Sequence, residues 1–226
     1  MGKFQLGQQD RARISAAVTQ AEGLSDSEVV TIIAPQSDAY HDVGLHYAVL
    51  AIFLLLAATA TFPAAFAGLA IDCFGGWEHH LSPSMLMTLL LGAMIALFLI
   101  VRYALAWVPL RLALTPKATK IRRVRRQAVA MFRACAQGRT RGRTAILIYL
   151  SLAEHRAEIV ADAEISARVA PELWGDAMAV LIHHVRAGDP GEGMVQAIGQ
   201  IGAILAQHIP KSVDNPDELP NAVIEL

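Results

Sequence analysis

Two long apolar runs without charged side chains dominate the hydropathy pattern of the chain. Residues 47–71 and residues 81–101 contain no Lys, Arg, Asp or Glu. A helix needs about 20 apolar residues, at about 1.5 Å each, to cross a hydrocarbon core of about 30 Å. We therefore predict a transmembrane helical hairpin over residues 44–113, with spans over about 47–71 and 81–103. Pro63 lacks a backbone donor and is expected to kink the first span.

Shorter patterned segments lie on both sides of the hairpin. Residues 27–34 (SEVVTIIA) are apolar and β-branched, which is typical of a buried strand. Because a lone strand forms no core, its partners are expected after the hairpin. There the pattern predicts strands over residues 144–152 and 156–161. Apolar residues spaced three and four apart predict helices over four ranges: 8–22, 118–137, 170–186 and 193–207.

The order of these elements describes one small α/β domain whose sequence the hairpin interrupts. Residues 1–43 and 117–210 form this domain, with helices expected on both faces of a short mixed sheet. The hairpin returns the chain to the side that it left, so the two parts can meet. The acidic tail, residues 211–226, contains two prolines and is expected to be extended and weakly packed.

The charges are distributed unevenly, although the net charge is only −1. Twelve of the 19 Lys and Arg residues lie between Arg102 and Arg143, and no acidic residue occurs between Glu78 and Glu154. The loop between the two runs contains no Lys or Arg. Because basic residues favour the cytoplasmic side of a membrane, we expect two spans with both termini in the cytoplasm. Cys73 would then lie across the membrane from Cys135, which argues against a disulfide between them.

Four segments of the chain, in their order and spacing, resemble a known protein family. They are SDSEVVTIIAPQSDAY (residues 25–40), GRTRGRTAILIYLSLAEHRAEIVAD (138–162), PELW (171–174) and RAGDPGEGMVQAIGQIGAIL (186–205). Together they resemble a bacterial membrane branch of the TPM domain family, named after thylakoid-lumen, photosystem-repair and receptor-modulating proteins. The resemblance implies an α/β/α sandwich, a three-layer fold, in a protein of the bacterial inner membrane. It also implies acid phosphatase activity and binding of a divalent cation, Ca²⁺ or Mg²⁺.

Three acidic residues are the candidate ligands of such a cation. Asp162 follows the last predicted strand, Glu172 stands where the family has the acid of a Leu-Pro-Asp turn, and Asp189 belongs to the counterpart of a Gly-Asp-Tyr turn. Hard cations are bound by several oxygen atoms that converge from loops. The alternative is that these acids cap helices or are solvated. This chain also departs from the family at Pro190, which replaces the tyrosine of the second turn.

A basic segment follows the second predicted span. We expect its arginines to contact anionic lipid headgroups, because each basic residue near such a surface adds about 1 kcal/mol of attraction. A nucleic-acid partner is not expected, since the membrane explains the charge. The residues are Arg122, Arg123, Arg125 and Arg126 of the predicted helix, with Arg139 and Arg141 of the turn after it.

These patterns lead to two functional hypotheses. The first is an integral membrane protein whose cytoplasmic domain is a protein-binding or accessory module for another membrane or membrane-associated protein. The alternative is a metal-dependent acid phosphatase. The lack of a recognised nucleophile motif and the altered acidic turns favour the first. A transporter or channel is disfavoured, because the two spans carry no buried ionisable residue that would mark an ion pathway.

Overall fold

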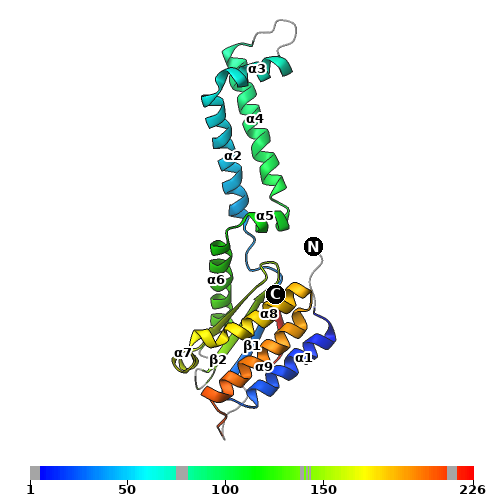
Figure 1. Ribbon diagram of the computed structural model, residues 1–226, viewed down its shortest axis with the longest axis vertical. Coiled ribbons are helices and arrows are strands. Elements are labelled where there is room, and N and C mark those ends of the chain that lie inside the picture. The colour runs from blue at the N-terminus through cyan, green and yellow to red at the C-terminus, as the bar shows by residue number, and fades with distance from the viewer. Residues whose placement is uncertain (1–5, 75–80, 138–139, 141, 143, 213–217) are drawn as a thin grey trace. The chain divides into compact units, whose positions relative to one another are not determined.

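The chain forms two compact units. The computed structural model describes residues 6–74, 81–137, 140, 142, 144–212 and 218–226. One unit, the α/β unit, comprises Met1–Asp38 and Lys117–Leu226, and the other, the helical unit, comprises Ala39–Pro116 (Figure 1). The α/β unit is therefore discontinuous in sequence, and the helical unit lies within the interruption.

A mixed four-stranded sheet lies at the centre of the α/β unit. Its strands are β1 (Glu28–Ala34), β2 (Ala145–Ser151), β3 (Arg156–Ala161) and β4 (Ile224–Glu225), in the order β3-β2-β1-β4. β1 is parallel to β2 and to β4, whereas β3 is antiparallel to β2. Every residue of β1 and β2 is buried, because these apolar strands are covered on both faces. The predicted α/β class and the three predicted strands are confirmed.

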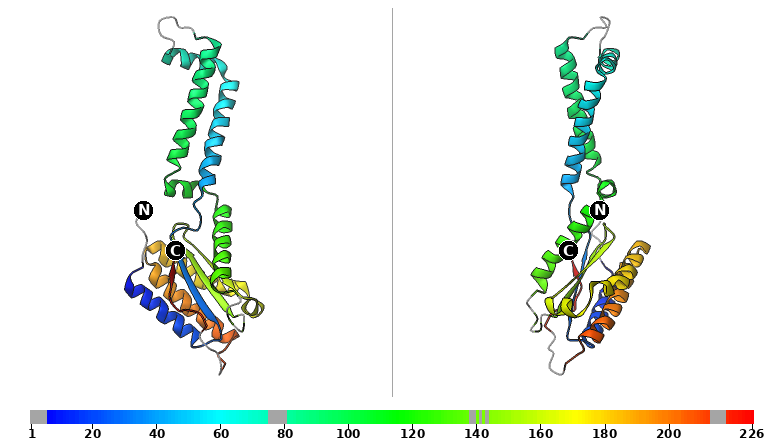
Figure 2. Two further views of the ribbon diagram at one scale, coloured as in Figure 1. Left: turned by 180° about the vertical axis from the view of Figure 1, so that it is seen from behind. Right: turned by 60° about the vertical axis from the view of Figure 1, so that its left-hand side comes forward.

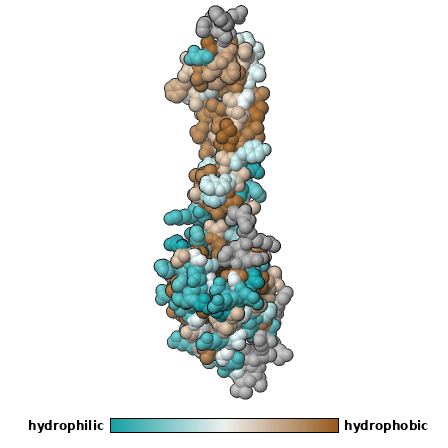
Figure 3. Space-filling view, turned by 90° about the vertical axis from the view of Figure 1, so that its right-hand side faces the viewer, coloured by the Kyte–Doolittle hydropathy of each residue, from teal (hydrophilic) through white to brown (hydrophobic). Residues whose placement is uncertain are grey.

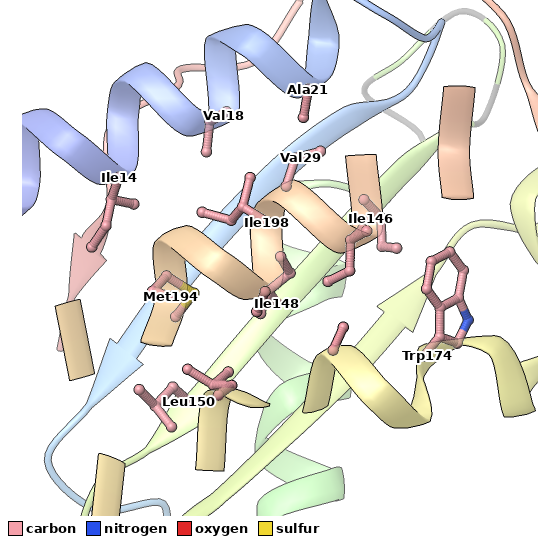
Figure 4. Close-up of a cluster of buried hydrophobic side chains, with 14 of the residues drawn as sticks. Ile14, Val18, Ala21, Val29, Ile146, Ile148, Leu150, Trp174, Met194 and Ile198 are labelled. Atoms are coloured by element: carbon pink, nitrogen blue, oxygen red, sulfur yellow. The ribbon is translucent and has the colours of Figure 1, made fainter. Parts of the chain in front are cut away.

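Helices cover both faces of this sheet (Figure 2). On one face lie α1 (Gln8–Glu22), α8 (Gly175–Ala187) and α9 (Pro190–His208), and on the other lies α6 (Lys117–Cys135). Since side chains alternate along a strand, each strand supplies both cores. The first core, shown in Figure 4, joins side chains of both strands to α1 and α9: Ile14, Val18, Val29, Ile146, Ile148, Met194 and Ile198. The second joins Ile32, Leu147 and Tyr149 to Val124 and Phe132 of α6.

Two short elements in the α/β unit differ from the sequence prediction. The chain forms α7 (Ala163–Arg168) and a 3₁₀ turn, η1 (Pro171–Trp174), before α8 begins. α9 begins at Pro190 instead of residue 193. Proline is favoured in the first turn of a helix, and the Asp189 side chain caps this one by accepting a hydrogen bond from the Glu192 backbone N at 3.0 Å.

The expectation of a weakly packed C-terminal tail is wrong for its last residues. β4 extends the sheet beside β1, where Ile224 pairs with Ile32. Leu219 is buried, and its backbone N donates to Glu28 Oε2 at 3.2 Å. These last residues cover an edge of β1 that would otherwise be open.

The helical unit contains α2 (His41–Thr61), α3 (Pro63–Phe74), α4 (Pro83–Ala104) and α5 (Val108–Leu114). α2 and α4, with 21 and 22 residues, are long and apolar enough to cross a membrane. The prediction of one span over residues 47–71 is wrong, because α2 ends at Thr61 and α3 starts anew at Pro63. Proline has no backbone N–H to donate to a helix, and its ring clashes with the preceding turn. The helix therefore ends before Pro63 instead of continuing with a kink.

Hydrophobic side chains cover the helical unit, whereas hydrophilic ones gather on the α/β unit (Figure 3). Large exposed apolar residues lie along both long helices, among them Phe53 at 63%, Leu91 at 57% and Ile100 at 65% exposure. By length and composition these helices suit a hydrocarbon environment.

Candidate functional site

Ion pairs within the α/β unit join the basic helix α6 to Asp38 and to β3. Asp38 Oδ2 lies 3.1 Å from Arg123 Nη1 and 3.0 Å from Arg126 Nη2. Arg125 Nη1 lies 3.2 Å from Glu158 Oε2 and donates to the Ile159 carbonyl at 2.8 Å. These arginines, expected to contact lipid headgroups, therefore have carboxylate partners within the protein.

Arg122 is the exception among the arginines that were expected to bind anions. It is exposed, and it has no ion pair in the part of the chain that the structure describes. Arg139 and Arg141 lie outside the described residues. The predicted headgroup contacts of α6 therefore reduce to Arg122 and to the exposed part of the paired arginines.

The three predicted metal ligands are not gathered at one place. Glu172 in η1 and Asp189 before α9 flank the two ends of α8, whose 13 residues extend about 20 Å. Both are exposed, whereas Asp162 is buried. Among the described residues, no group of three or more His, Cys, Asp or Glu side chains is arranged to hold a metal ion. α8 therefore separates Glu172 from Asp189, and binding of Ca²⁺ or Mg²⁺ at any of the three positions stays a prediction.

Asp162 lies beside a cavity of about 350 Å³. It follows β3 and is 7% exposed, and its Oδ2 atom has no hydrogen-bond partner among the described residues. Its backbone N donates to the Ala145 carbonyl at 2.9 Å, which fixes its position at the amino end of β2. Arg133 of α6 and Gln137, two residues after its end, also line the cavity. The site offers one buried carboxylate and one guanidinium, which is far from the six to eight oxygens that Ca²⁺ prefers.

A second polar cluster lies at the carboxyl ends of β1 and β2, where open α/β sheets place their sites. Glu154 Oε1 accepts from the Ser37 backbone N at 3.0 Å, and its Oε2 accepts from the Ser151 hydroxyl. The Ser37 hydroxyl lies 3.1 Å from the Tyr149 hydroxyl. Burial raises the pKa of Tyr149, the hydrogen bond with Ser37 lowers it, and the charge of Glu154 raises it further.

Sequence reasoning missed this cluster. The signal was available in the Ser151 to Glu154 spacing directly after an apolar strand, but Ser37 comes from the end of another strand. The cluster ties the segment that leaves β1 to the turn between β2 and β3. Its two serine hydroxyl groups bond to a carboxylate and to a phenol.

The comparisons with known proteins support the fold. No protein-family model and no curated protein matches this chain. A similar solved structure is the NMR structure of BA42 protein from the psychrophilic bacterium Bizionia argentinensis sp. nov.. The match covers 100% of this chain and 99% of that chain, with a TM-score of 0.58 and 15% sequence identity. At this identity the likeness concerns the fold alone, which is a mixed α/β fold.

Proposed function

We propose that this chain is an integral protein of a bacterial inner membrane, with two spans and a cytoplasmic TPM-like α/β sandwich that acts as a protein-binding or accessory module. The observation that carries the proposal is the exposure of α2 and α4. Only 17% of the apolar window of α2, and 0% of that of α4, is buried within the protein. Apolar surfaces of this extent need a lipid or protein environment.

The pairing of the strands supports two crossings. β1 precedes α2 in the chain, β2 follows α4, and the two strands are parallel neighbours from Glu28↔Ala145 to Ala34↔Ser151. Both strands must therefore lie on the same side of any membrane that the intervening chain crosses. α2 and α4 supply two crossings, whereas the 12 residues of α3 reach only about 18 Å.

The basic residues after α4 support a cytoplasmic position for the α/β unit. The segment from Arg102 to Arg126 contains eight Lys or Arg residues and no acid, whereas the loop between α3 and α4 contains no Lys or Arg. Basic residues next to a span are retained on the cytoplasmic side. Both termini belong to the α/β unit, and we place them in the cytoplasm with it.

A binding role is favoured over catalysis by the positions of the acidic residues. A metal-dependent hydrolase needs several ligands around one ion, but α8 separates Glu172 from Asp189. The Glu154 cluster, in turn, uses its carboxylate to join two loops. The proposed partner is another membrane or membrane-associated protein that the α/β unit contacts at the membrane surface.

The two native cysteines test the topology. Cys73 is exposed near the end of α3, and Cys135 is half-buried at the end of α6. A membrane-impermeant maleimide applied to intact spheroplasts should label Cys73, and should label Cys135 only after permeabilisation. The variants Cys73→Ser and Cys135→Ser assign each signal to one thiol. Labelling of Cys135 before permeabilisation would contradict the proposed orientation.

The binding role can be tested by crosslinking in native membranes. Leu173 in η1 is 45% exposed on the α/β unit, and a photoreactive amino acid at this position should yield adducts with a second protein. The same substitution at Leu91 in α4, which is 57% exposed, reports lipid neighbours for comparison. Photoproducts with lipid alone at both positions, or with no neighbour at Leu173, would argue against a docking module.

A metal-dependent acid phosphatase is the second candidate, favoured by the unpartnered carboxylate oxygen of Asp162 beside its cavity. If the cavity binds a phosphate ester, the full chain should hydrolyse an aryl phosphate. Asp162→Asn should then abolish turnover, whereas Asp189→Asn, at the far end of α8, should leave it unchanged. Equal activity of the wild type and Asp162→Asn, or no hydrolysis at all, would exclude this candidate.

A further inference from the structure

A hollow at the outer edge of the sheet gathers basic side chains from three elements. β3 is an outermost strand, so helices from opposite faces of the sheet meet around its first residues. Lys117 and Lys120 come from the first turn of α6, Arg156 from the start of β3, and Arg186 from the last turn of α8. Together they line a cavity of about 390 Å³, which is within the range of small-molecule sites.

These four cations have no counterion among the described residues. None of them forms an ion pair or a hydrogen bond with another side chain in the part of the chain that the structure describes. In this they differ from Arg123 and Arg126 of the same helix α6, which share Asp38. Four concentrated and uncompensated positive charges attract an anion into the hollow.

Among the described residues, one carboxylate lines this cavity, and its oxygens already accept hydrogen bonds within the protein. Glu154 is buried, and its oxygens accept from the Ser37 backbone N and the Ser151 hydroxyl. His155, exposed beside it, has a φ of 47°, a left-handed conformation that is uncommon for residues other than glycine. The turn is held by hydrogen bonds from Leu152 N to the Ala34 carbonyl and from Ala153 N to the Pro35 carbonyl, so Arg156 is presented from a fixed backbone.

We propose that this hollow, bounded by Lys117, Lys120, Arg156 and Arg186, binds a phosphate group. Guanidinium and ammonium groups donate charge-assisted hydrogen bonds to phosphate oxygens, and a site with both suits this anion. The phosphate belongs either to an anionic phospholipid headgroup or to a soluble phosphorylated molecule. Lys117 immediately follows the helical unit in the sequence, and this adjacency favours the lipid. The lipid source rests on the proposed membrane location, whereas the site itself does not.

Two parallel measurements on the full chain distinguish the two sources. In the first, thermal unfolding in a neutral detergent is followed with sodium phosphate and with sodium chloride at equal ionic strength. A ligand that binds the folded state alone raises the midpoint by mass action. In the second, the chain is reconstituted in phosphatidylcholine vesicles containing phosphatidylglycerol, and the lipids retained after gentle extraction are identified by native mass spectrometry.

Matched arginine variants make the test specific. Arg156→Gln removes a charge from the hollow, and Arg122→Gln removes the same charge from the exposed side of α6, outside the lining of this cavity. Arg156→Gln should weaken phosphate binding or lipid retention roughly tenfold, as expected for the loss of one charge-assisted hydrogen bond. Lys120→Gln should act in the same direction, and Arg156→Lys should restore part of the binding. Arg122→Gln should leave phosphate binding unchanged and should lower lipid retention less than Arg156→Gln does.

Each outcome decides the proposal. Specific loss in the phosphate measurement alone supports a soluble ligand, and specific loss in lipid retention supports a headgroup. If neither measurement separates Arg156→Gln from Arg122→Gln, the attraction comes from the general positive charge and the site is refuted. Folding of each variant is checked by circular dichroism. Failure of the cysteine labelling pattern would overturn the proposed topology but would leave the phosphate measurement valid.

Discussion

At Gly202, helix α9 lies so close to α1 that no side chain fits between them. A Cβ atom at this position would lie 2.7 Å from Ala21 Cβ and 3.2 Å from Ala21 Cα. Gly199, three residues earlier in the same helix, is exposed, and a Cβ there would have no neighbour within 4 Å. The two glycines therefore have different physical roles, although both occur in the repeated Ile-Gly sequence of one helix.

Alanine substitution should separate these roles. Gly202→Ala should lower the free energy of unfolding by about 1–3 kcal/mol, because the two helices must move apart to admit the methyl group. Gly199→Ala should raise it by about 0.5–1 kcal/mol, since alanine is the better helix former and meets no neighbour. Chemical denaturation of the full chain in detergent measures both. Effects of the same sign would contradict the close approach of α1 and α9.

The raised pKa of Tyr149 leads us to expect a lower free energy of unfolding at alkaline pH. Burial raises the pKa of its hydroxyl above the ordinary value of 10.0, so the folded state keeps the proton that the unfolded state loses first. The contribution is fully present below pH 10 and is lost as the pH rises beyond it. Thermal unfolding measured up to about pH 11 should show this decline.

Two variants identify the group. Tyr149→Phe should make the alkaline decline shallower, while losing about 1 kcal/mol at neutral pH with the hydrogen bond to Ser37. Ser37→Ala removes the same hydrogen bond but keeps the phenol, so its alkaline decline should persist. Superimposable pH profiles for all three proteins would show that another group controls the transition.

Among the elements, β4 shows how a very short strand can matter. Its residues pair with β1, and the Leu226 backbone N donates to the Ile33 carbonyl at 3.2 Å. Glu225 Oε1 lies 2.6 Å from Arg11 Nε, and its Oε2 accepts from the Leu6 backbone N at 3.3 Å. The last residues thus connect the sheet edge to the N-terminal segment.

Removal of residues 223–226 should destabilise the α/β unit by roughly 2–3 kcal/mol, about 1 kcal/mol for each sheet hydrogen bond that is lost. Glu225→Gln keeps the strand and breaks only the ion pair with Arg11, whose side chain is 47% exposed, so its effect should stay below about 1 kcal/mol. Urea titration compares the two variants. A truncation no worse than Glu225→Gln would mean that β4 adds little to the sheet.

Sequence patterns predict elements well where the determinant is local. The apolar, β-branched run of β1 and the three- and four-residue spacing of Ile14 and Val18 in α1 determine both elements without knowledge of their partners. β4 is a strand only because β1 offers it an edge. At Pro63, the sequence shows that the helix ladder is interrupted, but whether it bends or ends depends on the conformation of Phe62.

The candidate sites were harder to predict, because each combines segments that are distant in the chain. Asp38 forms an ion pair with Arg126, although the whole helical unit lies between them in the sequence. The length of α8 shows that Glu172 and Asp189 lie apart. The sequence did not predict the hollow lined by Lys117, Lys120, Arg156 and Arg186. Its lining comes from three elements, and no single stretch of sequence contains it.

For the whole molecule, the proposed membrane location makes a quantitative prediction. Ile95 lies near the middle of α4 and is 54% exposed, whereas Tyr103 lies at its end and is 72% exposed. Ile95→Lys should disfavour insertion by about 3 kcal/mol, because the charge would lie in the hydrocarbon core. Tyr103→Lys should be nearly neutral, since the lysine can extend to the headgroup layer.

Alkaline carbonate extraction of membranes measures the difference. The wild type and Tyr103→Lys should remain in the pellet, and Ile95→Lys should move substantially into the soluble or degraded fraction. Equal behaviour of the two lysine variants would indicate that α4 is covered by protein and does not face lipid.

The parallel pairing of β1 with β2 has a consequence for the order of events during synthesis. Ala34 and Ala145 are 111 positions apart, so at about 5–20 residues per second the ribosome needs roughly 5–20 s to reach β2 after completing β1. During that interval both apolar helices emerge and, in the proposed membrane location, are delivered to the membrane. Until β2 is synthesised, both edges of β1 stay unpaired. Unpaired strand edges can pair with other chains, which leads to aggregation. The yield of this protein should depend on how quickly its hairpin is inserted.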